Sequence, residues 1–172
     1  MIFLAFDTET TGLVDFTKPA SDPCQPKLVQ LAWALCDGPV VLSARCDTIA
    51  PYYEGGIPEE ATAIHGITTE MAERHGVPVS DAIEAFSIAA ILAEVEAVVG
   101  HNVHFDRRIV ESSCIALMSV TPSDLGLGPG EMTLGMFDEA REFGSLRCTM
   151  RECDRDASAK RSKWPTLDEA HR

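Results

Sequence analysis

The chain opens on a short run of bulky apolar residues, Ile2 to Phe6, which leads at once into Asp7-Thr8-Glu9-Thr10-Thr11-Gly12-Leu13. An apolar run of this length, bounded by turn formers, predicts a buried strand. Residues two apart on a strand point to the same face, so Asp7 and Glu9 should project together near its end. Adjacent carboxylates repel each other, and a hard cation such as Mg²⁺ or Mn²⁺ relieves that repulsion. An isolated Asp-x-Glu pair also fits a plain polar exit from a strand.

The rest of the chain alternates strand and helix signals in an order typical of a single α/β domain with a mixed sheet. Residues 14–27 hold three prolines and indicate an irregular loop. Further strands are expected at 29–36, 40–49 and 97–101. One helix is expected to start at Pro58 and end near Gly66, and a second to open at Thr68 and end at Gly76. A longer helix should follow, capped by Ser80, and another is expected over 105–118. Towards the end we expect a loop over 119–136, partial helix over 137–152, a mobile loop over 154–163 and a helix opening at Thr166.

Composition and charge limit the classes of function. The chain of 172 residues contains no apolar stretch of membrane-spanning length and no basic segment before its first apolar run, so we expect a cytoplasmic protein without a membrane partner. The net charge of −13 argues against a protein that coats nucleic acid. Residues 1–140 hold 6 Lys or Arg against 21 Asp or Glu, whereas residues 141–172 hold 8 against 6. The basic end is either a solvated surface or a local phosphate-facing patch.

The six cysteines are scattered and contain no Cys-x-x-Cys pair, so they indicate neither a zinc site nor a redox motif. Cys36, Cys46 and Cys114 lie in apolar stretches and are expected to be buried free thiols.

Three segments, in order, resemble motifs of one enzyme family. Asp7 to Leu13 resembles the first motif of the DEDDh 3′–5′ exonucleases, the family of the epsilon proofreading subunit of DNA polymerase III, ribonuclease T and oligoribonuclease. The segment Val98 to Asp106 predicts a strand, a glycine turn and the start of a helix. It resembles the family's second motif, G-H-N-x-x-F-D. Ala63 to Thr68 resembles the family's H-G-I-T segment. Taken singly, Asp106 also fits a helix-capping acid, and His65-Gly66 fits a helix C-cap.

The resemblance implies a ribonuclease H-like fold, in which a mixed central sheet is flanked by helices. It also implies that Asp7, Glu9 and Asp106 are catalytic and hold two Mg²⁺ or Mn²⁺ ions. The implied reaction removes nucleoside 5′-monophosphates from the 3′ ends of single-stranded DNA or RNA. Whether a polymerase is a partner stays an open question. The residues implied to contact substrate are Thr8, Thr10, Thr11, Gly12, Leu13, His65, Asn102 and Phe105.

The family's third motif, a His followed about five residues later by an Asp, has no match after the segment Lys163 to Ala170. We therefore expect residues 1–172 to form a single exonuclease domain that lacks its third-motif helix, through truncation or natural shortening, and to be weakly active. Two other functions remain open at this stage. One is a non-catalytic module of the same fold that binds nucleic acid or a polymerase, and the other is an unrelated metal-dependent phosphatase.

Overall fold

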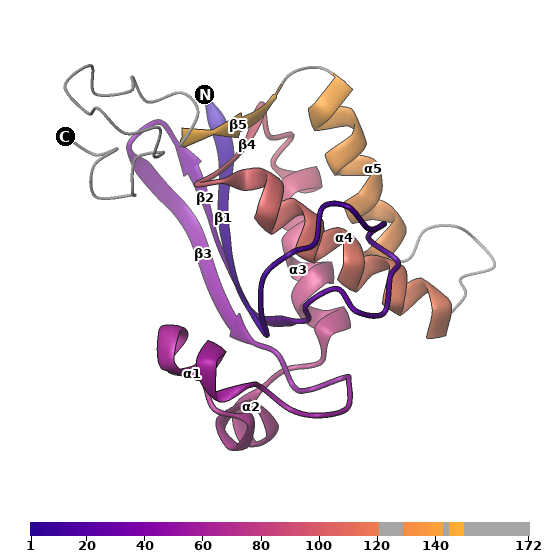
Figure 1. Cartoon of the computed structure of the whole chain (residues 1–172). Helices are drawn as coiled ribbons and strands as arrows, with labels where there is room; N and C mark the ends of the chain where they lie inside the picture. The colour runs from indigo at the N-terminus through magenta and orange to yellow at the C-terminus, as the bar shows by residue number, and fades with distance from the viewer. Residues whose placement is uncertain (121–128, 143–144, 150–172) are drawn as a thin grey trace, which may run out of the picture.

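The computed structural model describes residues 1–120, 129–142 and 145–149, which form a mixed sheet and five helices (Figure 1). The elements are β1 (Ile2–Thr10), β2 (Leu28–Asp37), β3 (Val40–Thr48), α1 (Glu59–His65), α2 (Thr69–His75), α3 (Val79–Leu92), β4 (Ala97–Gly100), α4 (Val103–Val120), α5 (Pro129–Glu142) and β5 (Leu146–Cys148).

The sheet has the strand order β3-β2-β1-β4-β5. β1, β2 and β3 pair antiparallel as consecutive strands, whereas β4 joins β1, and β5 joins β4, in parallel. This arrangement confirms the predicted α/β class with a mixed sheet. The first strand extends beyond its apolar run and continues through Asp7 and Glu9 to Thr10.

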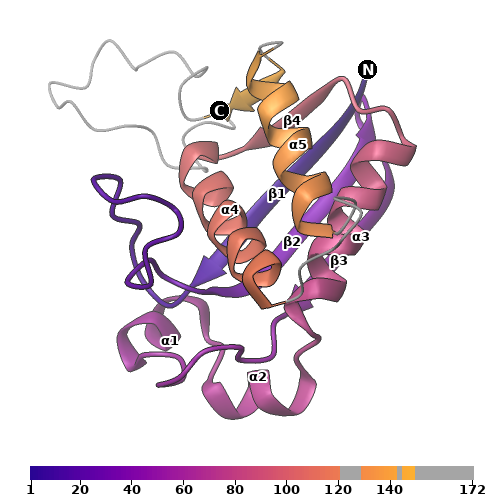
Figure 2. The same ribbon diagram turned by 90° about the vertical axis from the view of Figure 1, so that its right-hand side faces the viewer.

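One face of the sheet is covered by α3, α4 and α5 (Figures 1 and 2). Alternate residues of β1, among them Leu4 and Phe6, are buried beneath these helices. The ring of Phe6 lies 5.3 Å from that of Phe86 on α3 and 5.7 Å from that of Phe137 on α5, centroid to centroid. The two helical rings lie 6.0 Å apart. This aromatic cluster joins both helices to the central strand.

The other face of the sheet carries small apolar residues around a hollow of about 610 Å³. Ala5, Ala32 and Ala34 form part of its lining, together with Asp7 and His101. Since side chains alternate along a strand, the residues between the buried ones of β1 face this hollow. The first of the two predicted carboxylates therefore lies on the face that no described helix covers.

The sequence predicted the short helices α1 and α2, and the structure places them at one end of the sheet (Figure 1). Gly66 ends α1 in the left-handed conformation, with φ 78°, and its N–H donates to Thr62 O at 2.7 Å. Thr68 caps α2 by accepting a hydrogen bond from Met71 N at 3.1 Å. Both boundaries follow ordinary helix-capping chemistry.

Several local predictions were wrong. Ser80 does not cap α3, which begins at Val79, because its hydroxyl donates to the neighbouring Asp81. Part of the expected 119–136 loop is the helix α5. The segment 137–152 is partly helical as expected, through the end of α5, but it also contains the strand β5, which was not expected. Cys46 is exposed on the edge strand β3, although Cys36 and Cys114 are buried.

The loop over 14–27 contains no helix or strand, and one buried side chain organises it. The amide of Gln25, 2 % exposed, donates to Asp15 O at 2.8 Å and to Pro19 O at 3.1 Å. Its carbonyl oxygen accepts from Asp15 N at 3.2 Å. The loop therefore has a defined path next to β1.

The expected mobile loop at 154–163 and the helix opening at Thr166 lie outside the described residues. Within the described part of the chain, no helix is long and apolar enough to cross a membrane.

Replacement of Phe86 by alanine tests the aromatic cluster. We expect Phe86→Ala to lower the free energy of unfolding by about 3–5 kcal/mol, because the ring is fully buried between Phe6 and Phe137. Urea unfolding followed by circular dichroism measures this loss. Leu92→Ala, on the same helix but 80 % exposed, is the matched control and should change stability by less than about 0.5 kcal/mol. Equal effects of the two substitutions would contradict this account of the core.

Candidate active site

Two of the three predicted carboxylates lie in the second half of β1. Asp7 is exposed and Glu9 is half-buried, whereas Thr8 between them is buried on the helical side. The pairing of β1 with β2 shifts register between Glu9 and Thr10, and such an irregularity re-aims side chains at a strand end. On the other side, β1 pairs with β4 only as far as Ala5. The carboxylate-bearing half of β1 therefore has one edge without a strand partner among the described residues.

The third carboxylate reaches this edge from α4. Asp106 lies in the first turn of α4 and is 3 % exposed. Its Oδ1 accepts hydrogen bonds from Thr8 N at 3.1 Å and from Thr8 Oγ1 at 2.7 Å. The helix thus supplies an acceptor to a strand N–H that β4 does not pair, and it fixes Asp106 near Asp7.

Burial raises the pKa of all three carboxyl groups, and the charge of Asp7 adds to the shift of the other two. The pKa of Asp106 is raised to about 7, by burial first and by the nearby Asp7 charge, while the hydrogen bonds from Thr8 oppose the shift. For Glu9, burial raises the pKa first and the charge of Asp7 second. The Asp7 side chain reaches solvent, yet the protein around its carboxyl excludes enough water to raise its pKa too. The three groups form an electrostatically strained set that a cation or a proton would relieve.

Two histidines lie near the carboxylates. His65, at the end of α1, lowers the pKa of Glu9, and His101, after β4, lowers that of Asp7. The Nδ1 atom of His65 accepts from Ile67 N at 3.1 Å, so the proton of the neutral ring lies on Nε2. That Nε2 atom is buried and has no hydrogen-bond partner among the described residues. It is an unsatisfied donor close to Glu9.

The loop that follows β1 is tied to the protein by its threonines. The hydroxyl of Thr10 donates to Gly12 O at 2.6 Å, as Thr8 donates to Asp106, so both of these hydroxyls are engaged inside the protein. Thr11 is bonded to a neighbouring segment through both its N–H and its hydroxyl. Leu13, in contrast, is 89 % exposed. The predicted substrate contacts of this loop thus stay predictions, with Leu13 as its most accessible side chain.

Asn102 and Phe105 lie on the tight turn from β4 into α4. Asn102 adopts a left-handed conformation with φ 60°, is exposed, and accepts from Phe105 N at 2.8 Å. Phe105 packs half-buried against the core. A Cβ on Gly100 would come within 3.0 Å of the Val103 side chain and 3.2 Å of Phe6 O, so the close approach of this turn to β1 requires glycine. The predicted contacts of Asn102 and Phe105 with substrate stay predictions.

The donor set suits a divalent cation in charge and chemistry, because three oxygen-bearing carboxylates with raised pKa values lie near one strand edge. However, the described residues contain no group of three or more Asp, Glu, His or Cys side chains positioned to hold a metal ion. Binding of a cation by all three would therefore require a small rearrangement of these side chains.

His101 was not among the residues singled out from the sequence. The structure places it on the wall of the hollow with Asp7, and its Nδ1 lies 3.0 Å from Thr149 Oγ1. Its position in Gly100-His101-Asn102, within the second motif, was the available signal.

No protein-family model and no curated protein sequence matches the chain. Similar solved structures include a moderately thermophilic exonuclease I from Methylocaldum szegediense, with 23 % identity, a TM-score of 0.50, and coverage of 64 % of this chain and 22 % of that one. A crystal structure of exonuclease I in complex with the inhibitor BCBP has 24 % identity, a TM-score of 0.52, and coverage of 66 % and 24 %. The chain thus spans about a quarter of the length of these proteins. The likeness confirms the predicted ribonuclease H-like α/β fold.

The raised pKa of Asp106 predicts a pH dependence of stability in EDTA. The folded state holds this proton up to about pH 7, whereas the unfolded chain releases it near 3.8, so stability should fall as the pH rises between these values. The free energy of unfolding of the wild type should fall between pH 5 and pH 8. In Asp106→Asn this fall should be smaller by about 2 kcal/mol. Urea unfolding at both pH values measures it. Asp138→Asn, an exposed acid on α5, is the control, and an unchanged pH slope in Asp106→Asn would refute the assignment.

Proposed function

We propose that this chain is a DEDDh-type 3′–5′ exonuclease domain, a metal-dependent phosphodiester hydrolase that acts on single-stranded DNA or RNA. The observation that carries the proposal is the pair of hydrogen bonds from Thr8 to Asp106. These bonds draw the carboxylate of the second motif to the strand that holds Asp7 and Glu9. The shared fold with structures described as exonuclease I supports the same reaction class.

Asp7, Glu9 and Asp106 would hold Mg²⁺ or Mn²⁺. When bound, such ions activate water and stabilise the attacking and leaving oxygens of a phosphodiester. The protein contributes the placement of the three carboxylates: β1 carries two of them, and Thr8 fixes the third. Because the groups repel one another in the absence of a cation, the site gains most when cation and phosphate are bound together.

The remaining residues near the carboxylates have roles in binding. The unpartnered Nε2–H of His65 can donate to a phosphate or sugar oxygen. Leu13, exposed at the end of the loop after β1, offers an apolar contact to the terminal base. We assign the hydroxyls of Thr8 and Thr10 to positioning of the site, because both are bonded within the protein.

An exonuclease assay tests the reaction. We expect slow, Mg²⁺- or Mn²⁺-dependent shortening of 5′-labelled single-stranded oligonucleotides, with nucleoside 5′-monophosphates as products and no cleavage in EDTA. Turnover should be slow because the sequence has no match to the third motif. Asp7→Asn should lower the rate about 100-fold or more, since it removes a charge from the set that holds the ions. Gel electrophoresis and chromatography of the products measure this.

Asp37→Asn is the matched control for that assay, since Asp37 pairs with Ile2 at the opposite end of β1. It should retain the wild-type rate. Cleavage of small phosphate esters alone would favour a phosphatase, and oligonucleotide binding without cleavage would favour a non-catalytic module. Equal activity of Asp7→Asn and the wild type would reject the proposed site.

Metal binding can be measured without turnover. At pH 8, Mg²⁺ or Mn²⁺ should raise the Tm of the wild type, because a ligand that binds only the folded state stabilises it by about 2.7 kcal/mol at 100 times its Kd. Asp7→Asn should lose most of this gain, and Asp37→Asn should keep it. Differential scanning fluorimetry against a metal titration is the measurement. The same gain in all three proteins would place the metal elsewhere.

A further inference from the structure

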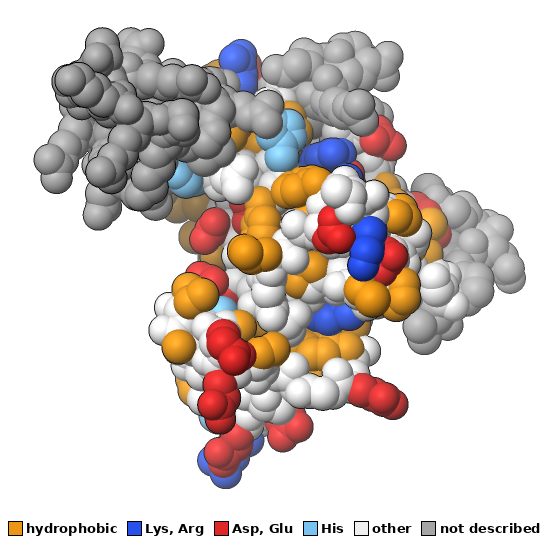
Figure 3. Space-filling model, viewed as in Figure 1, with side chains coloured by type: hydrophobic (Ala, Val, Ile, Leu, Met, Phe, Trp, Pro, Cys, Tyr) orange, Lys and Arg blue, Asp and Glu red, His pale blue; other side chains and the backbone are white. Residues whose placement is uncertain are grey.

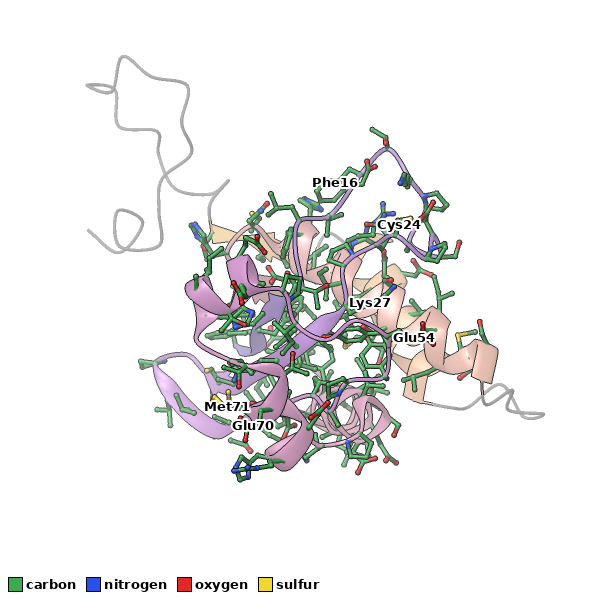
Figure 4. The ribbon with its side chains drawn as sticks, turned by 60° about the horizontal axis from the view of Figure 1, so that its bottom comes forward. Phe16, Cys24, Lys27, Glu54, Glu70 and Met71 are labelled. Atoms are coloured by element: carbon green, nitrogen blue, oxygen red, sulfur yellow. The ribbon has the colours of Figure 1, made fainter. Side chains whose placement is uncertain are left out.

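A second pocket, of about 400 Å³, begins where the loop after β1 leaves the carboxylates. It is lined by residues 11–13 of that loop, by 24–27 and by part of 53–58. Figure 4 labels Cys24, Lys27 and Glu54, which come from the two latter segments. Two residues of chain span at most roughly 7 Å, so Thr11 on the wall of the pocket lies no farther than that from Glu9. The pocket is therefore within reach of a strand whose terminal phosphodiester lies at Asp7 and Glu9.

The backbone of Lys27 is fixed to the loop after β1. Thr11 N donates to Lys27 O at 3.0 Å, and Lys27 N donates to Thr11 Oγ1 at 2.9 Å. The next residue, Leu28, begins β2 and donates from its N–H to the hydroxyl of Tyr52 at 3.2 Å. The base of the Lys27 side chain thus keeps one position relative to the carboxylate strand.

Lys27 differs in its partners from the other Lys and Arg side chains of residues 1–120. Residues 1–120 contain six Lys or Arg, and the other five each lie within 4.0 Å of a carboxylate. No described carboxylate lies within that distance of Lys27. Its Nζ donates to Pro23 O at 3.0 Å, which leaves two of its three N–H donors for another acceptor.

The chain as a whole is acidic, with a net charge of −13, and the acids of α1 and α2 gather at the lower end of the molecule (Figure 3). The carboxylates of such a surface repel the phosphates of a nucleic acid strand, so a phosphate binds only where a cation offsets this repulsion. The pocket with Lys27 is such a place, although the exposed Glu54 also lies on its wall.

The opposite wall of the pocket is formed by Tyr53, Glu54 and two glycines, Gly55 and Gly56, and Glu54 is its one acidic residue. Burial raises the pKa of Tyr53 to about 12, so its phenol stays neutral. Gly55 and Gly56 have φ values of 95° and 67°, conformations that glycine adopts without strain. A Cβ on Gly55 would meet nothing within 4 Å, so this wall is open.

We propose that this pocket binds the phosphodiester next to the one that is cleaved, with Lys27 Nζ donating to its non-bridging oxygen. The proposal rests on the proposed function, since it takes the carboxylates as the cleavage site. It makes Lys27 a positioning residue that distinguishes a nucleic acid strand from a mononucleotide, because only the strand has a neighbouring phosphate.

The test compares binding of a 5′-fluorescein-labelled oligothymidylate with that of thymidine 5′-monophosphate as competitor, by fluorescence anisotropy with Ca²⁺ present. Lys27→Ala should weaken oligonucleotide binding about tenfold, because one charge-assisted hydrogen bond is lost. The dependence of log Kd on log salt concentration should fall in slope by about 0.7, the value for one phosphate contact on a single strand. Affinity for the mononucleotide should change less than twofold.

Two further variants complete the experiment. Lys18→Ala removes the same charge from the loop that contains Lys27, but Lys18 is paired with Asp15 at 3.8 Å, so this variant should bind as the wild type does. Lys27→Arg should bind within about threefold of the wild type, since it keeps the charge. Circular dichroism and the Tm confirm that each variant is folded.

The outcomes separate this inference from the proposed function. If the wild type cleaves the oligonucleotide and Lys27→Ala binds it equally well, the role of Lys27 is wrong and the exonuclease remains. If binding depends on Lys27 but no cleavage occurs under any metal condition, the pocket is supported and the catalytic proposal fails. If the wild type neither binds nor cleaves, both fail.

Discussion

The hydrogen bonds from Thr8 to the buried carboxylate of Asp106 are the interaction on which the candidate site depends. β4 leaves the second half of β1 unpaired after Ala5, and a buried N–H without an acceptor is costly. Asp106 satisfies it, and α4 is thereby fixed against the central strand. The same contact places a third carboxyl near Asp7, in a buried position that raises its pKa although the bonds from Thr8 oppose the shift. One contact thus serves the packing of the fold and creates the charged site.

The one-sided packing of the sheet explains where these groups can meet. Leu4, Phe6 and Thr8 face the helices, so Asp7 faces the hollow on the other side. A carboxylate from a helix can approach Asp7 only around the strand edge, which is where Asp106 lies. The chain as a whole is acidic and repels the phosphates of a nucleic acid strand that extends from this edge. The proposed role of Lys27 is to bind one of these phosphates.

Much of the fold was predictable from local pattern, because the strands of the first half are apolar runs separated by strong turn signals. The errors fell where tertiary burial outweighed composition. α5 contains glycines and a proline that suggested a loop, yet it buries Phe137 against Phe6 and Phe86. β5 has three residues, too few for a periodicity, and it forms because β4 offers a free edge. Cys46 is exposed because β3 is an edge strand.

The sequence by itself determined the order of elements from β1 to α4, the caps of the short helices, and the residue types that gather at the end of β1. Those features depend on neighbours along the chain, through side-chain alternation and capping chemistry. Only the tertiary structure decided that Asp106 bonds to Thr8, that His101 faces the same hollow as Asp7, and that Lys27 has no described carboxylate partner. These relations join residues distant in sequence, and their energies arise from burial and charge that no local pattern records.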